Sequence, residues 1–331
     1  MPFSDKEKLD KLLSKVDETQ KNSVNVDFLD RQFSILYLPS QGHYYPDGTD
    51  SLLIRYLSAK EEAVLTDHML VESGHAMRMV LGNLIVSDFN IDQLLAGDFH
   101  AISMFLRSNA YGNKIELDVV CPNCQEEQKK KLRLDSFQMK DIRQLPDEGN
   151  VISCTLPLSK IKVVMKIPTF KDEIYFEREG IQNSLRKFNV LIQEFAGETD
   201  EVFIDENLMN LPIRDVRFLK KFLEDSTPGV DTSFHHQCTK CDHEFKSSFA
   251  IGDGFLKLPL EYREVVMNEV FLCHYYGKGI SKSHAESMPT FHRSWTINRI
   301  QEELDKKQKA EERAQKKSQN SARSRKGRSN R

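Results

Sequence analysis

The sequence predicts an α+β protein in which β-hairpins and helices occupy separate stretches of the chain. Two Cys-x-x-Cys motifs, Cys121–Cys124 and Cys238–Cys241, each lie between segments in which apolar and polar residues alternate, as they do in half-buried strands. Residues 58–110 instead carry apolar residues at helical spacing. The 113 residues between the motifs contain both patterns. We therefore expect two hairpins that enclose a large α+β insertion and pack with a helical segment.

The cysteine motifs indicate a metal site. Four cysteines in two such turns match the tetrahedral all-cysteine set that binds structural zinc. The predicted Zn²⁺ ligands are Cys121, Cys124, Cys238 and Cys241. One shared ion would join two hairpins that are far apart in the sequence into a zinc-ribbon-like unit. Because four thiolates fill the coordination sphere, such a site supports the fold and leaves no position open for chemistry.

Two other interpretations of the motifs are weaker. In the first, each motif binds its own ion, and His235, His236 or His243 replaces a cysteine beside the second motif. The first motif has no histidine nearby, which disfavours this arrangement. In the second, a single Cys-x-x-Cys is a redox pair, but the βαβ pattern of a thioredoxin-like fold is missing. The remaining cysteines, Cys154 and Cys273, lie among apolar residues and are expected to be buried free thiols.

Composition limits the class of protein further. The chain has 331 residues, of which 39% are hydrophobic and 29% charged, with a net charge of −3, as in ordinary globular proteins. No run of about 18 apolar residues would span a membrane, and residues 1–8 lack the apolar region of a signal peptide. We expect a protein of the reducing cytosol, without membrane contact and without a general attraction to nucleic acid.

The pattern divides the chain into five segments. A hairpin with a turn at Asp47-Gly48 precedes a helix that starts at Ser58, where Glu61 completes a capping box. The expected segments are a polar N-terminal arm at 1–32, the hairpin and helical segment at 33–113, the cysteine hairpins with their insertion at 114–250, C-terminal helices at 251–309 and a disordered basic tail at 310–331.

Both ends of the chain have features of interaction segments. In the arm, four apolar residues recur at helical spacing, which predicts either a short amphipathic docking helix or a solvated terminus; they are Leu9, Leu12, Leu13 and Val16. Near the other end, the chain's single tryptophan, Trp295, lies in a helix over 294–309 in which Ile297, Ile300 and then Leu304 form an apolar side. This helix would dock on a partner or on the chain's own core.

The tail raises nucleic-acid binding as an alternative function. The last 19 residues carry eight basic side chains and no acidic one, and beyond residue 310 no apolar residue is larger than alanine. Such a segment buries too little to order itself. Around the cysteine motifs the charges are mixed, with Glu126, Glu127, Asp242 and Glu244 among the lysines. A zinc-ribbon nucleic-acid binder that uses the tail is therefore the second hypothesis.

Catalysis has little support in the sequence. The phosphate-binding, nucleophile-elbow and H-E-x-x-H metalloprotease motifs are all missing. Histidines at 68, 75 and 100 lie in helical stretches, where packing or surface roles are usual. We expect a protein that is not an enzyme.

Five short motifs follow one another over residues 36–135: LPSQGHYYP at 38–46, SAKEE at 58–62, LLAGD at 94–98, RSNAYG at 107–112 and VVCPNC at 119–124. As an ordered set they resemble the tail baseplate hub family of T4-like bacteriophages, whose members are hub subunits or hub-assembly proteins. The resemblance implies chaperone-like or structural contacts with other baseplate hub or tape-measure proteins. It also implies a location in the infected host cytoplasm and in the tail baseplate of the virion. The resemblance does not extend beyond about residue 250.

Overall fold

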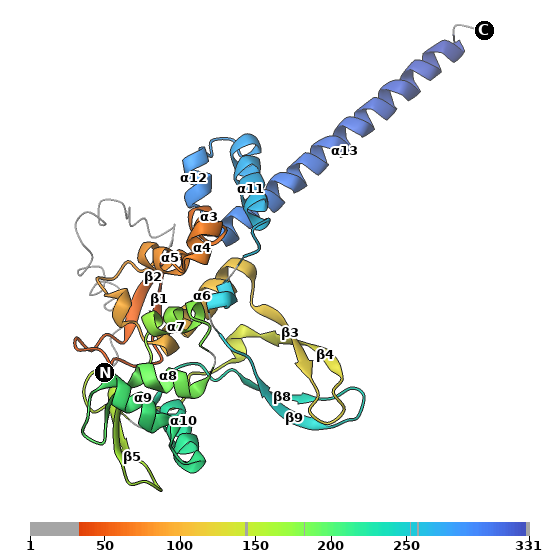
Figure 1. The fold of residues 1–331 in the computed structure, drawn as a ribbon. Helices are drawn as coiled ribbons and strands as arrows, with labels where there is room; N and C mark the ends of the chain where they lie inside the picture. Colours follow the sequence, from red (N-terminus) through yellow and green to blue (C-terminus); the bar gives the residue numbers. More distant parts are fainter. Residues whose placement is uncertain (1–32, 143–144, 182, 252, 257, 329–331) are drawn as a thin grey trace, which may run out of the picture.

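The computed structural model describes residues 33–142, 145–181, 183–251, 253–256 and 258–328. The predicted N-terminal arm, 1–32, lies outside the described residues. Small antiparallel sheets alternate with helices along the chain, which confirms the α+β class (Figure 1). No helix among the described residues is long and apolar enough to cross a membrane.

The first region is the predicted hairpin followed by helices. Strands β1 (Phe33–Tyr37) and β2 (Ser51–Arg55) pair antiparallel, with Phe33 opposite Arg55. The predicted capping box is present. The Ser58 side chain accepts a hydrogen bond from the backbone of Glu61, and the Glu61 side chain accepts one from the backbone of Ser58. The helices that follow are α3 (Ala59–Leu65), α4 (His68–Glu72), α5 (Ala76–Leu84), the 3-10 turn η1 (Ile91–Gln93) and α6 (Ala96–Tyr111).

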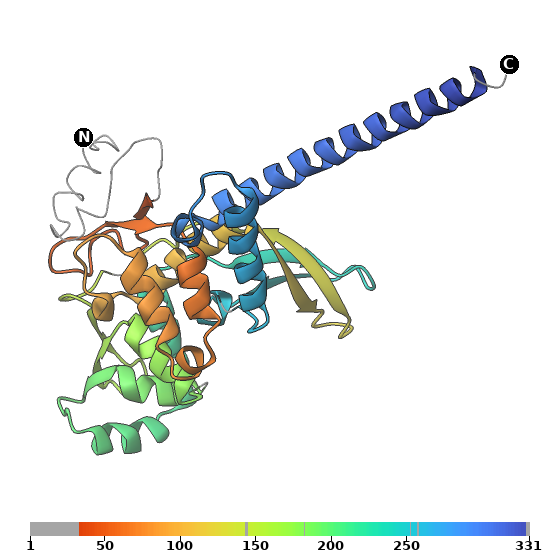
Figure 2. The same cartoon turned by 90° about the horizontal axis from the view of Figure 1, so that it is seen from above.

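Each cysteine motif joins the two strands of a hairpin. The first hairpin is β3 (Lys114–Val120) with β4 (Glu127–Arg133), which leads into the 3-10 turn η2 (Leu134–Ser136). The second is β8 (Ser233–Gln237) with β9 (Glu244–Ser248). Figures 1 and 2 show the two hairpins side by side, extending from the same edge of the body.

The insertion between the hairpins is itself α+β. Its antiparallel sheet has the order β5-β6-β7, with β5 at Val151–Thr155, β6 at Lys162–Lys166 and β7 at Ile192–Phe195. Its helices are α7 (Phe170–Arg178), α8 (Ser184–Leu191), α9 (Glu201–Met209) and α10 (Ile213–Ser226). One hydrophobic core includes Leu52 and Phe99 from the first region together with Met165 and Phe195 from the insertion. The insertion therefore packs on the first region.

Two of the motifs that carry the family resemblance, those at 38–46 and 94–98, contact each other. The buried Asp98 carboxylate accepts from the Ser40 amide at 3.0 Å and from the Tyr45 hydroxyl at 2.6 Å. The same hydroxyl accepts from the Leu95 amide at 3.0 Å. The 38–46 loop is thus fixed on the N-terminal turn of α6.

Gly97 is required by a close backbone approach. A Cβ atom there would lie 1.8 Å from the Pro228 carbonyl oxygen. We expect Gly97→Ala to destabilise the protein by about 1–3 kcal/mol or more, as overpacking does. Gly82→Ala is the matched control, because its Cβ would meet only Ile91 Cδ1 at 3.6 Å within helix α5. That change should stabilise by up to about 1 kcal/mol. Urea unfolding measures both, and equal midpoints would contradict this account of Gly97.

The C-terminal helices pack on the first region. After the 3-10 turn η3 (Asp253–Leu256), α11 (Tyr262–Tyr276), α12 (Lys282–Ser287) and α13 (Thr290–Arg328) follow. The Thr290 amide donates to the Leu57 carbonyl at 2.8 Å. Ile297 packs against the small core that includes Val266 and Cys273. The start of α13 therefore docks on the chain's own core, whereas Trp295 stays 67% exposed.

Helix α13 then leaves the body and projects as a single rod (Figures 1 and 2). Residues 301–316 are all exposed. The sequence predicts disorder from residue 310, whereas the structure continues the helix to Arg328. Burial alone would leave this segment disordered, because it contains no apolar residue larger than alanine. The segment is rich in Ala, Glu, Lys, Gln and Arg, which favour helix without tertiary contacts, and Arg299 pairs with Glu303 one turn later.

Candidate metal centre

The same turn is built twice, once at the tip of each cysteine hairpin. In the first, the Cys121 amide donates to the Glu126 carbonyl at 3.0 Å, and the Gln125 amide donates to the Cys121 carbonyl at 2.9 Å. In the second, the corresponding bonds from Cys238 to His243 and from Asp242 to Cys238 are both 3.0 Å. The fifth residue of each turn has a left-handed backbone, with φ of 59° at Gln125 and 55° at Asp242.

These turns bring the four predicted ligands together. All four Sγ atoms lie within 4.8 Å of one another. Sγ of Cys121 is 3.7 Å from Sγ of Cys241, and Sγ of Cys124 is 3.6 Å from Sγ of Cys238. A Zn–S bond of about 2.3 Å places tetrahedral sulfurs about 3.8 Å apart, whereas a disulfide needs about 2.05 Å. The arrangement therefore fits a tetrahedral four-sulfur metal site.

Local hydrogen bonds prepare one of the sulfurs for ligation. At Cys238, desolvation opposes ionisation, but hydrogen bonds from the amides of Lys240 and Cys241 and from the thiols of Cys124 and Cys241 together outweigh it and lower the pKa to about 6. At Cys124, an amide of Glu126 lowers the pKa, but desolvation and the neighbouring sulfurs raise it to about 12. The thiols of Cys238 and Cys124 thus differ in pKa, and a bound cation would stabilise both as thiolates.

Gln128 on β4 links the two turns. Its Nε2 donates to Cys238 Sγ at 2.9 Å, while its Oε1 accepts from the Thr239 amide at 3.2 Å. The same Oε1 lies 3.0 Å from Nε2 of His236. An ion pair between Lys240 and Glu126 adds a second link between the turns. Gln128 could not be identified from the sequence. Its one signal was a polar residue at an inward, half-buried position of the strand beside a ligand.

The histidines considered as alternative ligands do not join the cluster. His236 contacts Gln128, the ring of His243 stacks on Phe245 with centroids 6.1 Å apart, and His235 is exposed. Of the two remaining thiols, Cys273 is buried as expected, whereas Cys154 is only partly buried. Burial raises the pKa of Cys154 to about 11.

Replacing Gln128 tests whether these outer contacts tune the site. We expect Gln128→Leu to weaken metal affinity by about 10–100-fold, as the loss of contacts to metal ligands typically does. Gln237→Leu is the matched control, because Gln237 precedes Cys238 but is exposed. Competition with a chromophoric chelator measures both affinities. Equal affinities for the two variants would show that Gln128 has no such role.

The base of the two hairpins is anchored to the body. A second hydrophobic core contains Met104 of α6, Ile115 of β3, Leu134 and Ile251. The Arg107 side chain donates to the Phe255 carbonyl at 3.0 Å, and its guanidinium lies 5.1 Å from the centre of the Phe255 ring. The four cysteines therefore lie at the tips of two hairpins whose bases pack against the body of the protein.

Comparisons with known proteins agree with the motifs in the chain. Searches of curated proteins and of solved structures gave no match. A family model described as "T4 bacteriophage base plate protein" matches residues 39–255, which is more than half of the chain. The matched region includes the 38–46 loop almost entirely, the N-terminal turn of α6 and all four clustered cysteines. The predicted resemblance to phage baseplate proteins is thereby confirmed, and the chain belongs to the family of T4 bacteriophage base plate proteins.

Proposed function

We propose that this baseplate protein is a component of the baseplate hub or a chaperone-like factor in hub assembly, and that it acts by protein–protein contacts without catalysis. In this proposal Cys121, Cys124, Cys238 and Cys241 hold one structural Zn²⁺. The family match over residues 39–255 is the observation that carries it. The four-sulfur cluster adds support, since a site of this kind stiffens a scaffold and offers no open coordination position.

Exposed apolar side chains supply surfaces for such contacts. Along one face of α11, Met267 is 66% exposed, Phe271 is 54% exposed and Tyr275 is 68% exposed. They follow one another at intervals of one helical turn, and the rings of Phe271 and Tyr275 stack with centroids 5.3 Å apart. Exposed apolar groups gathered in this way often mark protein-binding sites.

Recovery of the protein's partners from infected cells tests this function. A tagged full-length chain should copurify with baseplate hub or tape-measure proteins, whereas recovery of host proteins alone would contradict the proposal. A variant with Cys121→Ser and Cys238→Ser is the control for dependence on the cysteine cluster. Detection of the chain in purified virions would identify a hub component, and its absence there would identify an assembly factor that leaves.

One observation favours nucleic-acid binding as a second candidate. Helix α13 carries the basic end of the chain away from the body, and its eight basic residues have no acidic neighbour over the last 19 positions. If this end binds DNA or RNA, the affinity should fall steeply as the salt concentration rises. On duplex DNA, the logarithm of the binding constant plotted against the logarithm of the salt concentration should have a slope of about −0.9 for each phosphate contact. Deletion of residues 313–331 should then abolish binding.

A further inference from the structure

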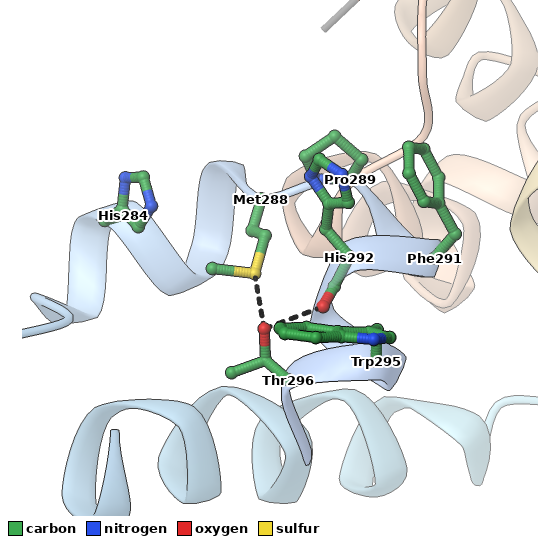
Figure 3. A pocket seen from close by; sticks show the side chains of 7 residues that line it. All are labelled: His284, Met288, Pro289, Phe291, His292, Trp295 and Thr296. Atoms are coloured by element: carbon green, nitrogen blue, oxygen red, sulfur yellow. Dashed lines mark hydrogen bonds between the residues drawn. The ribbon is translucent and has the colours of Figure 1, made fainter. Parts of the chain in front are cut away.

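A groove of about 600 Å³ lies between α12 and the first turns of α13. Figure 3 shows its walls, with His284 at one end and Phe291 at the other. Its lining is largely apolar and aromatic and consists of His284, Met288, Pro289, Phe291, His292, Trp295 and Thr296. Trp295 is 67% exposed and Phe291 is 37% exposed. Large aromatic side chains in an open groove leave apolar surface for an occupant to cover.

The groove is preformed by contacts with the body. The Thr296 hydroxyl donates to the His292 carbonyl at 2.8 Å and lies 3.7 Å from Met288 Sδ, which ties its two walls together. The Phe291 ring meets Tyr56 edge to face, with centroids 5.2 Å apart. The first turn of α13 is held by hydrogen bonds from Thr290 to the Leu57 carbonyl.

The chain enters the described structure close to this groove. Phe33, the first described residue, pairs with Arg55 at the end of β2. Three residues after Arg55, Ser58 bridges to Pro289, which lines the groove. The 32 residues before Phe33 therefore join the chain at a strand pair that leads, through Arg55 and Ser58, to one wall of the groove.

The sequence of that segment suits an apolar groove. Leu9, Leu12, Leu13 and Val16 would lie on one side of a helix, which is how amphipathic helices fill hydrophobic grooves. The residues from Asp17 to Gln32 can span up to about 55 Å when extended. Because the segment is tethered, its effective concentration at the groove would be on the order of millimolar. A weak contact is then sufficient for occupancy.

We propose that residues 9–16 of this chain occupy the groove between α12 and α13 and cover Trp295. The segment then covers the aromatic lining of the groove from within the same chain. This inference does not depend on the metal centre or on a role at the hub, because it uses neither the cysteine hairpins nor any function assigned through the family match.

Trp295 is the only tryptophan, so its fluorescence reports on the groove alone. In the full-length protein we expect Trp295 to be shielded from acrylamide. Leu12→Asp with Leu13→Asp should move its emission to longer wavelength and increase quenching, and Leu9→Asp should give a smaller change in the same direction. Ser14→Asp is the matched control, because position 14 lies on the opposite side of the same helix, and it should change nothing.

A synthetic peptide of residues 1–20, added to the double variant, should restore the shielding. Equal quenching in the wild type and the double variant would overturn the proposal. Shielding that increases with protein concentration, together with a dimeric mass, would assign the groove to a second copy and would also overturn it. Urea unfolding of each variant distinguishes release of the segment from loss of the fold.

Discussion

Cys238→Ser is expected to abolish Zn²⁺ binding at the proposed four-cysteine site and to separate the tips of both hairpins. Binding of structural zinc supplies on the order of 10 kcal/mol to folding, which is comparable with the whole stability of a typical domain. Only the tips depend directly on the site, because the hairpin roots pack in their own hydrophobic core around Met104 and Ile115. We therefore expect local unfolding first, while the core shared by the first region and the insertion persists.

Hydrogen exchange with metal analysis measures this effect. In the variant, amides at the tips of the β3–β4 and β8–β9 hairpins should lose protection together, while those near Ile115 stay protected, and the metal content should fall to zero. Cys154→Ser is the matched control, since Cys154 is a partly buried thiol in β5, outside the cluster. If both variants keep their metal and their protection, the four-cysteine account is wrong.

Arg293→Met is the second change with a large expected effect. Arg293 is fully buried, pairs with the fully buried Glu62, and places Nε 2.8 Å from Glu269 Oε2. Glu62 also accepts from the Tyr111 hydroxyl at 3.1 Å. This cluster joins α13 to α3, α6 and α11. Removing one partner of a buried pair typically costs about 3–5 kcal/mol, because the remaining charge has no compensation.

The loss of stability caused by Arg293→Met should also depend on pH, in a direction that the pKa of Glu62 determines. Desolvation already raises the pKa of Glu62, against the opposing effect of Arg293, and loss of the arginine should raise it further. A carboxyl with a raised pKa binds its proton more tightly in the folded state, so stability falls as pH rises. The penalty of Arg293→Met should therefore shrink in mildly acidic buffer.

Arg299→Met on the same helix is the control. Arg299 is half exposed and pairs with the exposed Glu302 and Glu303. Exposed pairs of this kind contribute at most about 1 kcal/mol. Urea unfolding at two pH values compares the variants, and equal losses of stability would contradict the importance of the buried cluster.

Features set by nearby residues could be predicted from the sequence. The Cys-x-x-Cys turns and the Ser58–Glu61 capping box depend on residues within one turn of each other, and both form as expected. The strands around the cysteine motifs were predicted for the same reason, since alternation over a few residues decides which face is buried.

Apart from the meeting of the two cysteine motifs, which metal chemistry predicted, contacts across long sequence separations could not be predicted in the same way. Gln128 contacts Cys238 across 110 residues, and Arg293 contacts Glu62 across 231 residues. Neither pair has a local pattern, because each depends on how separate elements pack. The continuation of α13 to Arg328 was missed for a different reason. Helix propensity and pairs one turn apart favour the helix there, although nothing apolar is buried.

X-ray absorption at the zinc edge, on the purified full-length protein, tests the central claim most directly. We predict one zinc per chain with four sulfur ligands at about 2.3 Å, and loss of that signal in the variant with Cys121→Ser and Cys238→Ser. A protein that takes up no metal, or that holds zinc through nitrogen and oxygen ligands, would contradict the claim that the two hairpins share one four-cysteine site.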